Sequence, residues 1–252
     1  MNAPLAVADW IALGFFFTAW IFYEPLLKKV GRPGGLINTD MTVIRMAWMR
    51  NMVRRDVRLM DGQLVGLVLN SASFFASSNL ILIAAAAGAL FNGDQSFKSA
   101  TAVSVIQTST PALFEFQVAL VVIPLARGLL AFIWSIRQLN YCLAAIGGAP
   151  IAPSATSDGY AEAVARLLNP ALSSFNAGVR GYYFAMAAAA WLFGPWAFLI
   201  ATMGAVALLY GRQKLSPTAA AIASLRQIIE TAPVQPASAP TNHADEGPAQ
   251  SL

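Results

Sequence analysis

Hydrophobic residues along this chain gather in four long stretches that polar segments separate. The stretches cover residues 5–27, 64–91, 113–136 and 181–210. Each is long enough to cross the ~30 Å hydrocarbon core of a bilayer as a helix. The pattern predicts an all-α fold, a polytopic membrane bundle of four transmembrane helices that forms one domain over residues 1–230.

A basic amphipathic segment at residues 39–61 leads into the second stretch. On a helical wheel its apolar face holds Met41, Ile44, Trp48, Met52 and Leu59. Arg50, Arg54 and Arg58 fall on the opposite face, where they are predicted to bind anionic lipid headgroups or an acidic partner. Alternatively, these arginines only mark the cytoplasmic side while the apolar face packs on a neighbouring helix. Because no proline interrupts residues 41–88, we expect one continuous helix from the membrane surface into the membrane.

The second stretch carries a stripe of small and polar residues along one helical face. Its members are Gly66, Asn70, Ser73, Ser77, Ala84 and Gly88. In hydrocarbon, small residues allow close helix packing, and hydroxyl or amide groups hydrogen-bond across the contact. The same face could instead line a watery path. Both interpretations stay open, and self-association of the chain is compatible with both.

Two charges lie inside the first and third stretches. Glu24 is 14 residues past Trp10 and Arg127 is 14 residues past Leu113, so we expect both at a similar depth. A charge within a membrane needs a partner and is a functional candidate. We therefore predict a Glu24–Arg127 pair, either as a structural clamp or as part of an ion or proton pathway. In the last stretch, the Gly194-Pro195 dipeptide predicts a kink.

Composition supports the membrane class, because 57% of the 252 residues are hydrophobic, 11% are charged and the mean hydropathy is +0.59. The net charge of +4 comes from cations beside the stretches, which indicate topology rather than nucleic-acid binding. The connections after the first and third stretches hold eleven cations: Lys28, Lys29, Arg32, Arg45, Arg50, Arg54, Arg55, Arg58, Arg137, Arg166 and Arg180. The opposite side holds four: Lys98, Arg212, Lys214 and Arg226. This bias predicts cytoplasmic connections and two external termini; the alternative is a re-entrant final segment with an internal C-terminus.

Catalytic and cofactor motifs are missing from the sequence. It contains no GxGxxG or Walker motif, no cluster of histidines and cysteines, and no set of residues suited to a serine triad. Cys142 and His243 are the single cysteine and histidine, which is too few for a metal site of that kind. His243 also lies in residues 231–252, a proline- and alanine-rich tail that we expect to be disordered. We therefore expect no enzyme, no cofactor and no metal centre.

Residues 45–90 read RMAWMRNMVRRDVRLMDGQLVGLVLNSASFFASSNLILIAAAAGAL. The run resembles the central stretch of the DUF599 family, an uncharacterised group of bacterial and plant membrane proteins. The likeness is carried by Trp48, Met49, Met52, Arg55, Arg58, Asp61, Ser71, Ser73, Phe74, Phe75, Ala76, Ser77 and residues 81–83. Segments around Glu115, Arg137 and residues 178–184 also resemble the family, so the likeness spans most of residues 5–215. It implies four spans and a bacterial inner-membrane location, and it implies no activity.

Two functions stay open from the sequence. One is a homo-oligomeric channel or small-solute conduit, in which the second spans surround an axis and the arginine helices form a basic entrance that favours anions. The other is a non-conducting scaffold or accessory subunit of a membrane complex, which docks lipid or a partner through its basic helix. We favour a self-associating protein that conducts, because a polar stripe along a whole span exceeds the needs of one packing contact.

Overall fold

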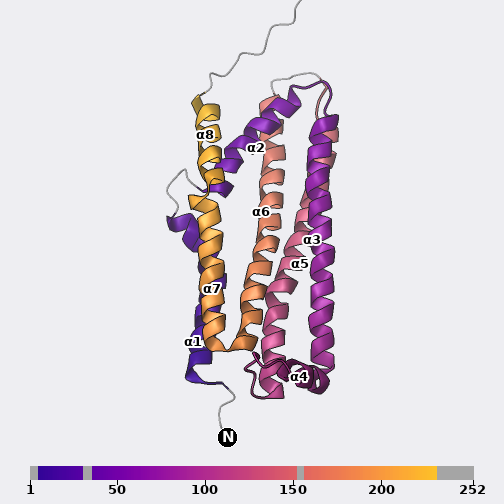
Figure 1. The fold of residues 1–252 in the computed structure, drawn as a ribbon. Coiled ribbons are helices and arrows are strands. Elements are labelled where there is room, and N and C mark those ends of the chain that lie inside the picture. Colours follow the sequence, from indigo (N-terminus) through magenta and orange to yellow (C-terminus); the bar gives the residue numbers. More distant parts are fainter. Residues whose placement is uncertain (1–4, 31–35, 152–155, 232–252) are drawn as a thin grey trace, which may run out of the picture.

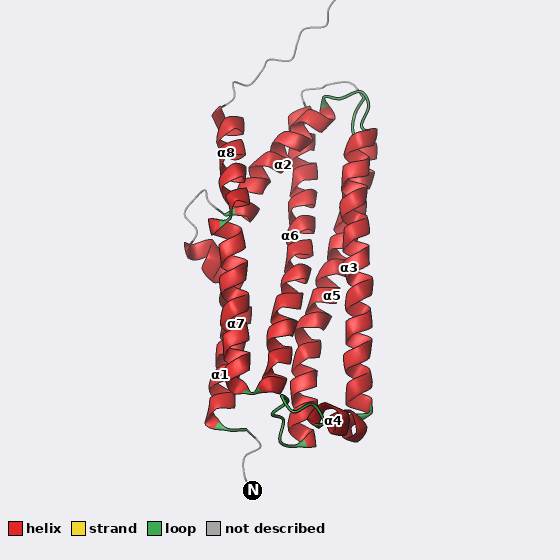
Figure 2. Cartoon of the chain, in the orientation of Figure 1, coloured by secondary structure: helices red, strands yellow, loops and turns green. Residues whose placement is uncertain are grey.

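The structure is a computed structural model that describes residues 5–30, 36–151 and 156–231 (Figure 1). Within these ranges it contains helices and no strand (Figure 2). The α-helices are α1 Val7–Val30, α2 Ile37–Val53, α3 Leu59–Phe91, α4 Gly93–Thr101, α5 Pro111–Gly147, α6 Ser157–Ala189, α7 Pro195–Tyr210 and α8 Pro217–Thr231. A 3-10 turn, η1 (Ala190–Phe193), and a π-helical turn, η2 (Gly211–Leu215), flank α7.

The long helices α1, α3, α5, α6 and α7 run along one common axis (Figure 1). Helix α2 lies obliquely across one end of the bundle beside α8, and α4 lies at the other end. Within the described part of the chain, four helical segments are long and apolar enough to cross a membrane: Val7–Pro25, Leu59–Phe91, Pro111–Gly147 and Pro195–Thr231. The predicted all-α bundle with four such helices is therefore confirmed.

The predicted span at residues 181–210 is wrong, because the chain reverses in its middle. Helix α6 ends at Ala189, and Gly194 adopts a φ of +102° before Pro195 begins α7. Glycine adopts this left-handed conformation without a Cβ penalty, and proline is well suited to the first helical turn. Helices α6 and α7 consequently lie antiparallel, so the N-terminal end of α1 and helix α8 lie at opposite ends of the molecule (Figure 1). By the positions of α1 and α8, the prediction that both ends of the chain share one side is wrong, and the alternative that places the C-terminal segment on the other side agrees with the structure.

The predicted continuous helix over residues 41–88 is broken between α2 and α3. Arg58 donates hydrogen bonds to the carbonyls of Met52 and Val53 at the end of α2, each at 3.3 Å. It also donates to the carbonyls of Ala149, at 2.7 Å, and Pro150, which follow α5. A guanidinium that satisfies the last carbonyls of a helix stabilises its end. The amphipathic segment therefore forms a separate helix that ends at Val53 and lies across the end of the bundle. The prediction that it continues into α3 as one helix is wrong.

Two apolar clusters stabilise the two ends of the bundle. The cluster near α2 includes Met49, Met52, Leu139 and Leu168, and all four side chains are almost fully buried. The cluster near α4 includes Phe16, Phe184, Trp191 and Phe198. The ring of Trp191 stacks on that of Phe198, with 5.2 Å between the ring centroids. The 33 residues of α3 extend to about 50 Å, well beyond a ~30 Å hydrocarbon core. Part of the bundle must therefore project out of the membrane.

Candidate functional site: an arginine-lined cavity

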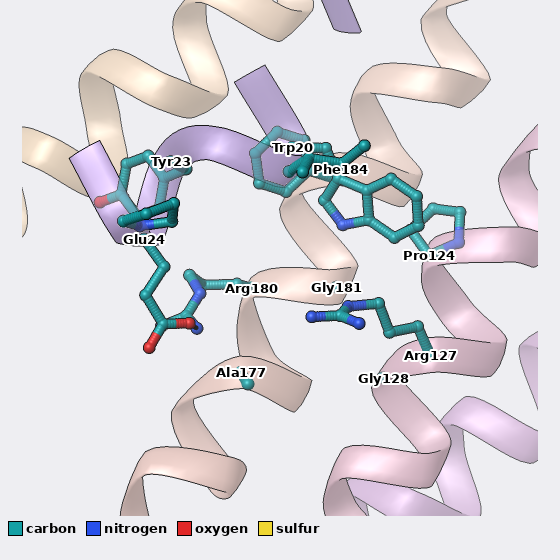
Figure 3. Close-up of a pocket in the computed structure, with 12 residues that line it drawn as sticks. Trp20, Tyr23, Glu24, Pro124, Arg127, Gly128, Ala177, Arg180, Gly181 and Phe184 are labelled. Atoms are coloured by element: carbon teal, nitrogen blue, oxygen red, sulfur yellow. Dashed lines mark hydrogen bonds and ion pairs between the residues drawn. The ribbon is translucent and has the colours of Figure 1, made fainter. Parts of the chain in front are cut away.

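A cavity of about 390 Å³ lies between α1, α5 and α6, and we call it the arginine cavity. Arg127 of α5 and Arg180 of α6 point into it, and Glu24 of α1 lies beside Arg180 (Figure 3). The rest of its wall is formed by Trp20, Ile21, Tyr23, Pro25, Pro124, Gly128, Ala177, Gly181 and Phe184. Arg127 is 16 residues from Pro111, about 24 Å along α5, so its charge is far from that end of the helix.

The two arginines have different partners. Arg180 donates a hydrogen bond to Glu24 at 2.7 Å, and its side chain is only 14% exposed. The guanidinium of Arg127 lies over the ring of Trp20, 5.9 Å from its centroid. Among the described residues, no carboxylate lies within ion-pair distance of Arg127. Since Glu24 is the single carboxylate among the described residues of the cavity wall, two cations of that wall face one anion.

The predicted Glu24–Arg127 pair is not the one that forms. Both residues line the same cavity at a similar depth, as expected, but Glu24 pairs with Arg180. Hydropathy marks only the strongly apolar stretches, whereas Arg180 lies on α6, a more polar helix that runs through the bundle beside α5 (Figure 1). A signal for Arg180 was present in the sequence: Gly178 and Gly181 flank it, which is typical of a helix in close contact with another.

Glycines hold the arginine cavity in shape by bringing α5 and α6 together. A Cβ on Gly181 would lie 2.8 Å from the carbonyl oxygen of Pro124, and a Cβ on Gly178 would lie 2.6 Å from the ring of Phe132. Asn79 of α3 donates a hydrogen bond to the carbonyl of Leu125 at 2.9 Å. Because the backbones meet directly at Gly128 and Gly181, Arg127 and Arg180 reach the same space from adjoining helices.

A second cavity of about 460 Å³ adjoins the first toward α2, and we call it the polar cavity. Tyr23, Glu24 and Arg180 line both cavities. The side chain of Arg45 on α2 also lines it and donates to the Asn169 side chain at 3.3 Å. Burial lowers the pKa of the Arg45 guanidinium, since a charge is disfavoured away from water. The polar wall comes from α2, α6 and η2: Asn38, Thr39, Thr42, Asn169, Ser173 and Gln213.

Three buried polar atoms on this wall lack a hydrogen-bond partner within the described part of the chain. They are the Tyr23 hydroxyl, Nε of Arg45 and Oε1 of Gln213. Buried polar groups in proteins are nearly always paired with protein, water or ligand. The polar cavity is therefore a place where a polar molecule is expected to bind.

The predicted stripe on α3 belongs to neither cavity. Asn70 and Ser77 are exposed on the outside of the single chain, and Ser73 is half-buried. Gly66 and Gly88 are half-buried, and a Cβ on either would meet nothing within 4 Å. The buried face of α3 instead holds Asp61, Val65, Ala72 and Asn79. The stripe is thus available to lipid or to another chain rather than used for packing inside this one.

The three arginines of the predicted lipid-binding face separate in the structure. Arg50 and Arg54 are exposed, and Arg54 lies 3.6 Å from Asp158 of α6. Arg58 instead donates four hydrogen bonds to backbone carbonyls, as described above. Binding of anionic headgroups through Arg50 and Arg54 stays a prediction, whereas Arg58 serves to join α2 to the α5–α6 connection.

A family model described as "Protein of unknown function, DUF599" matches residues 11–218 of the chain. The chain belongs to the DUF599 family. Comparison with curated proteins and with solved structures found no match. The matched range contains every residue that lines the arginine cavity and the polar cavity, from Trp20 to Gln213. In this DUF599 protein both cavities thus belong to the part of the chain that defines the family.

Sequence reasoning missed several residues of the site in this DUF599 protein. Arg45 and Arg180 were counted as indicators of topology, and Gln213 was not considered. Each lies on a helix whose contacts depend on the reversal at Gly194, so its neighbours could not be inferred from the linear pattern. The arrangement that results is an electropositive space inside an apolar bundle, which is suited to binding an anion.

Proposed function

We propose that this protein binds a small oxyanion in the arginine cavity and passes it across the membrane. The observation that carries the proposal is the excess of positive charge there: Arg127 and Arg180 face one carboxylate, Glu24. An uncompensated cation among apolar helices is costly, and a bound anion offsets that cost. Arginine also presents several N–H donors in a planar fork that matches carboxylate and phosphate groups.

The route toward the α2 end supports passage rather than simple capture. The polar cavity shares Tyr23, Glu24 and Arg180 with the arginine cavity, so a solute in one lies next to the other. This route runs through a single chain, beside α1, α5 and α6. It differs from the predicted route, in which the second spans of several chains would surround an axis with Asn70 and Ser77 facing water.

Substitution of Arg127 by glutamine tests the proposal. The purified protein is reconstituted into vesicles of neutral lipid, and the vesicles are loaded with radiolabelled phosphate or glycerate. Efflux of the anion from the vesicles is then measured. We expect Arg127→Gln to reduce efflux of at least one anion about tenfold or more, since a hydrogen bond to a charged group contributes about 1.5–3 kcal/mol. Arg127 is preferable to Arg180 as a target because its removal leaves the Glu24–Arg180 ion pair in place.

Arg137→Gln is the matched control, because Arg137 lies on the same helix over Trp134, 6.0 Å from the ring centroid, and outside both cavities. Its efflux should equal that of the unsubstituted protein. A second arm measures binding of anionic phosphatidylglycerol. If that lipid binds in an Arg127-dependent manner and neither anion leaves the vesicles, the cavity holds a lipid headgroup and the transport proposal is wrong.

Self-association through α3 is a second proposal, and the exposure of Asn70 and Ser77 favours it. An amide in hydrocarbon gains from a partner on another helix. Oxidative cross-linking of Ser77→Cys should yield a covalent dimer, while Leu130→Cys, which is exposed on α5, should not. Equal cross-linking of the two variants would point to random collision and contradict the proposal. The native Cys142 is buried and does not interfere.

A further inference from the structure

We infer that the polar cavity recognises a small organic anion that carries hydroxyl groups, and that it selects the solute which the arginine cavity then receives. The inference rests on the proposed function and names the class of its substrate. The volume of the polar cavity, about 460 Å³, lies within the range of about 300–1,000 Å³ that is usual for small-molecule sites. The observation that carries it is that three residues lining this cavity, Tyr23, Arg45 and Gln213, each hold a buried polar atom with no hydrogen-bond partner in the described part of the chain.

The chemistry of these three atoms defines the ligand. Nε of Arg45 is a charged donor, Oε1 of Gln213 is an acceptor, and the Tyr23 hydroxyl can donate or accept. A carboxylate oxygen satisfies Arg45, but it cannot satisfy Gln213 Oε1, which needs an O–H or N–H donor. A molecule with one carboxylate and neighbouring hydroxyl groups meets all three requirements.

The charge balance favours a single negative charge on the ligand. The ionised side chains on the wall are Arg45, Arg180 and Glu24, and the last two form an ion pair with each other. Arg45 makes its one side-chain hydrogen bond to the neutral Asn169, and no carboxylate within the described ranges lies within ion-pair distance of it. One guanidinium therefore stays without a counterion in this space, and one carboxylate balances it.

The local fold around Gln213 agrees with a binding role. Gln213 lies in η2, a π-helical turn between α7 and α8, and turns of this kind occur often at functional sites. Arg45 approaches from α2 and Tyr23 from α1. The three residues with an unpaired group thus line the polar cavity from three separate segments of the chain.

Binding of glycerate and propionate, measured by titration calorimetry on the purified full-length protein, tests this inference. The two anions share a three-carbon skeleton and one carboxylate, and glycerate adds two hydroxyl groups. We expect glycerate to bind at least about tenfold more tightly, because a site built for hydrogen bonds rejects an analogue that lacks them. Gln213→Leu should remove most of this preference and leave the affinity for propionate unchanged.

Gln227→Leu, at an exposed position of α8, is the matched control and should preserve the preference. Tyr23→Phe removes only a hydroxyl and gives a second test if Gln213→Leu unfolds; it too should weaken glycerate binding selectively. Equal affinities for the two anions would overturn the inference. If neither anion binds while phosphate efflux still depends on Arg127, the inference fails and the proposed function stands. If efflux is also independent of Arg127, both fail.

Discussion

At the scale of single residues, the neighbours of each arginine decide its role. Arg58 precedes an apolar stretch of the chain, and Arg127 lies inside one. Arg58 is surrounded by carbonyl groups and makes four hydrogen bonds to them. Arg127 lies against the face of Trp20 and points into a cavity. The first residue therefore stabilises the fold, and the second is available for a ligand.

Replacing Arg58 by glutamine should lower the free energy of unfolding by about 2–3 kcal/mol, because backbone carbonyls lose a charged partner. Arg54→Gln is the control from the same connection. Its 3.6 Å pair with Asp158 is exposed, and its loss should cost no more than about 0.5 kcal/mol. Thermal unfolding in detergent measures both effects. Equal stability of the two variants would show that Arg58 does not join α2 to the end of α5.

At the scale of helices, the contact between α5 and α6 positions the arginine cavity. At Gly128 and Gly181 the backbones of the two helices meet directly. Phe132 fills the space beside Gly178, and its ring stacks on Phe75 at 5.8 Å. Close packing of this kind was predicted for the stripe on the second span. It occurs instead between α5 and α6, at Gly128, Gly178 and Gly181.

Gly178→Ala should destabilise the protein by about 1–3 kcal/mol, because the new methyl group would overlap the buried ring of Phe132. Gly159→Ala is the control on the same helix. A Cβ there meets nothing within 4 Å, so replacing glycine in an exposed helical turn should be neutral or stabilise by up to about 1 kcal/mol. Unfolding midpoints of the two variants give the comparison. A Gly178→Ala protein as stable as the unsubstituted one would contradict the close contact.

At the scale of the whole molecule, positive charge is concentrated at the end that holds α2 and α8. Arg50, Arg54, Arg166 and Arg226 belong to helices or turns of this end, and within the described part of the chain Lys98 is the only cation on α4. The reversal at Gly194 moves the C-terminal cations to this end, which makes the asymmetry greater than the sequence predicted. By the positive-inside rule, we propose that the α2 end faces the cytoplasm of a bacterial inner membrane.

Cysteine labelling tests this orientation. Ser99 on α4 and Ser224 on α8 are both exposed, and the native Cys142 is buried. With a membrane-impermeant maleimide, Ser99→Cys should react in intact cells, whereas Ser224→Cys should react only after permeabilisation. Reaction of both variants from the same side would contradict the opposite placement of α4 and α8.

Most helices could be predicted from the sequence, but the pairing inside the site could not. The apolar runs that contain α1, α3 and α5 are evident from hydropathy, and Glu24 and Arg127 were recognised as unusual because they interrupt such runs. Helix α6 is more polar, since its first half lies in the projecting part of the bundle. Hydropathy therefore does not reveal α6 as a long helix, and it does not reveal Arg180 of α6 as the partner of Glu24.

The sequence by itself determined the class of the molecule, the approximate positions of its apolar helices and the depth of its interior charges. These properties follow from composition and periodicity, which are local along the chain. The tertiary structure decided that residues 181–210 form a reversal, that the stripe on α3 faces outward, and that Glu24 pairs with Arg180. Each of these depends on which helix faces which, and that choice is made by close contacts such as those of Gly178 and Gly181 rather than by hydropathy.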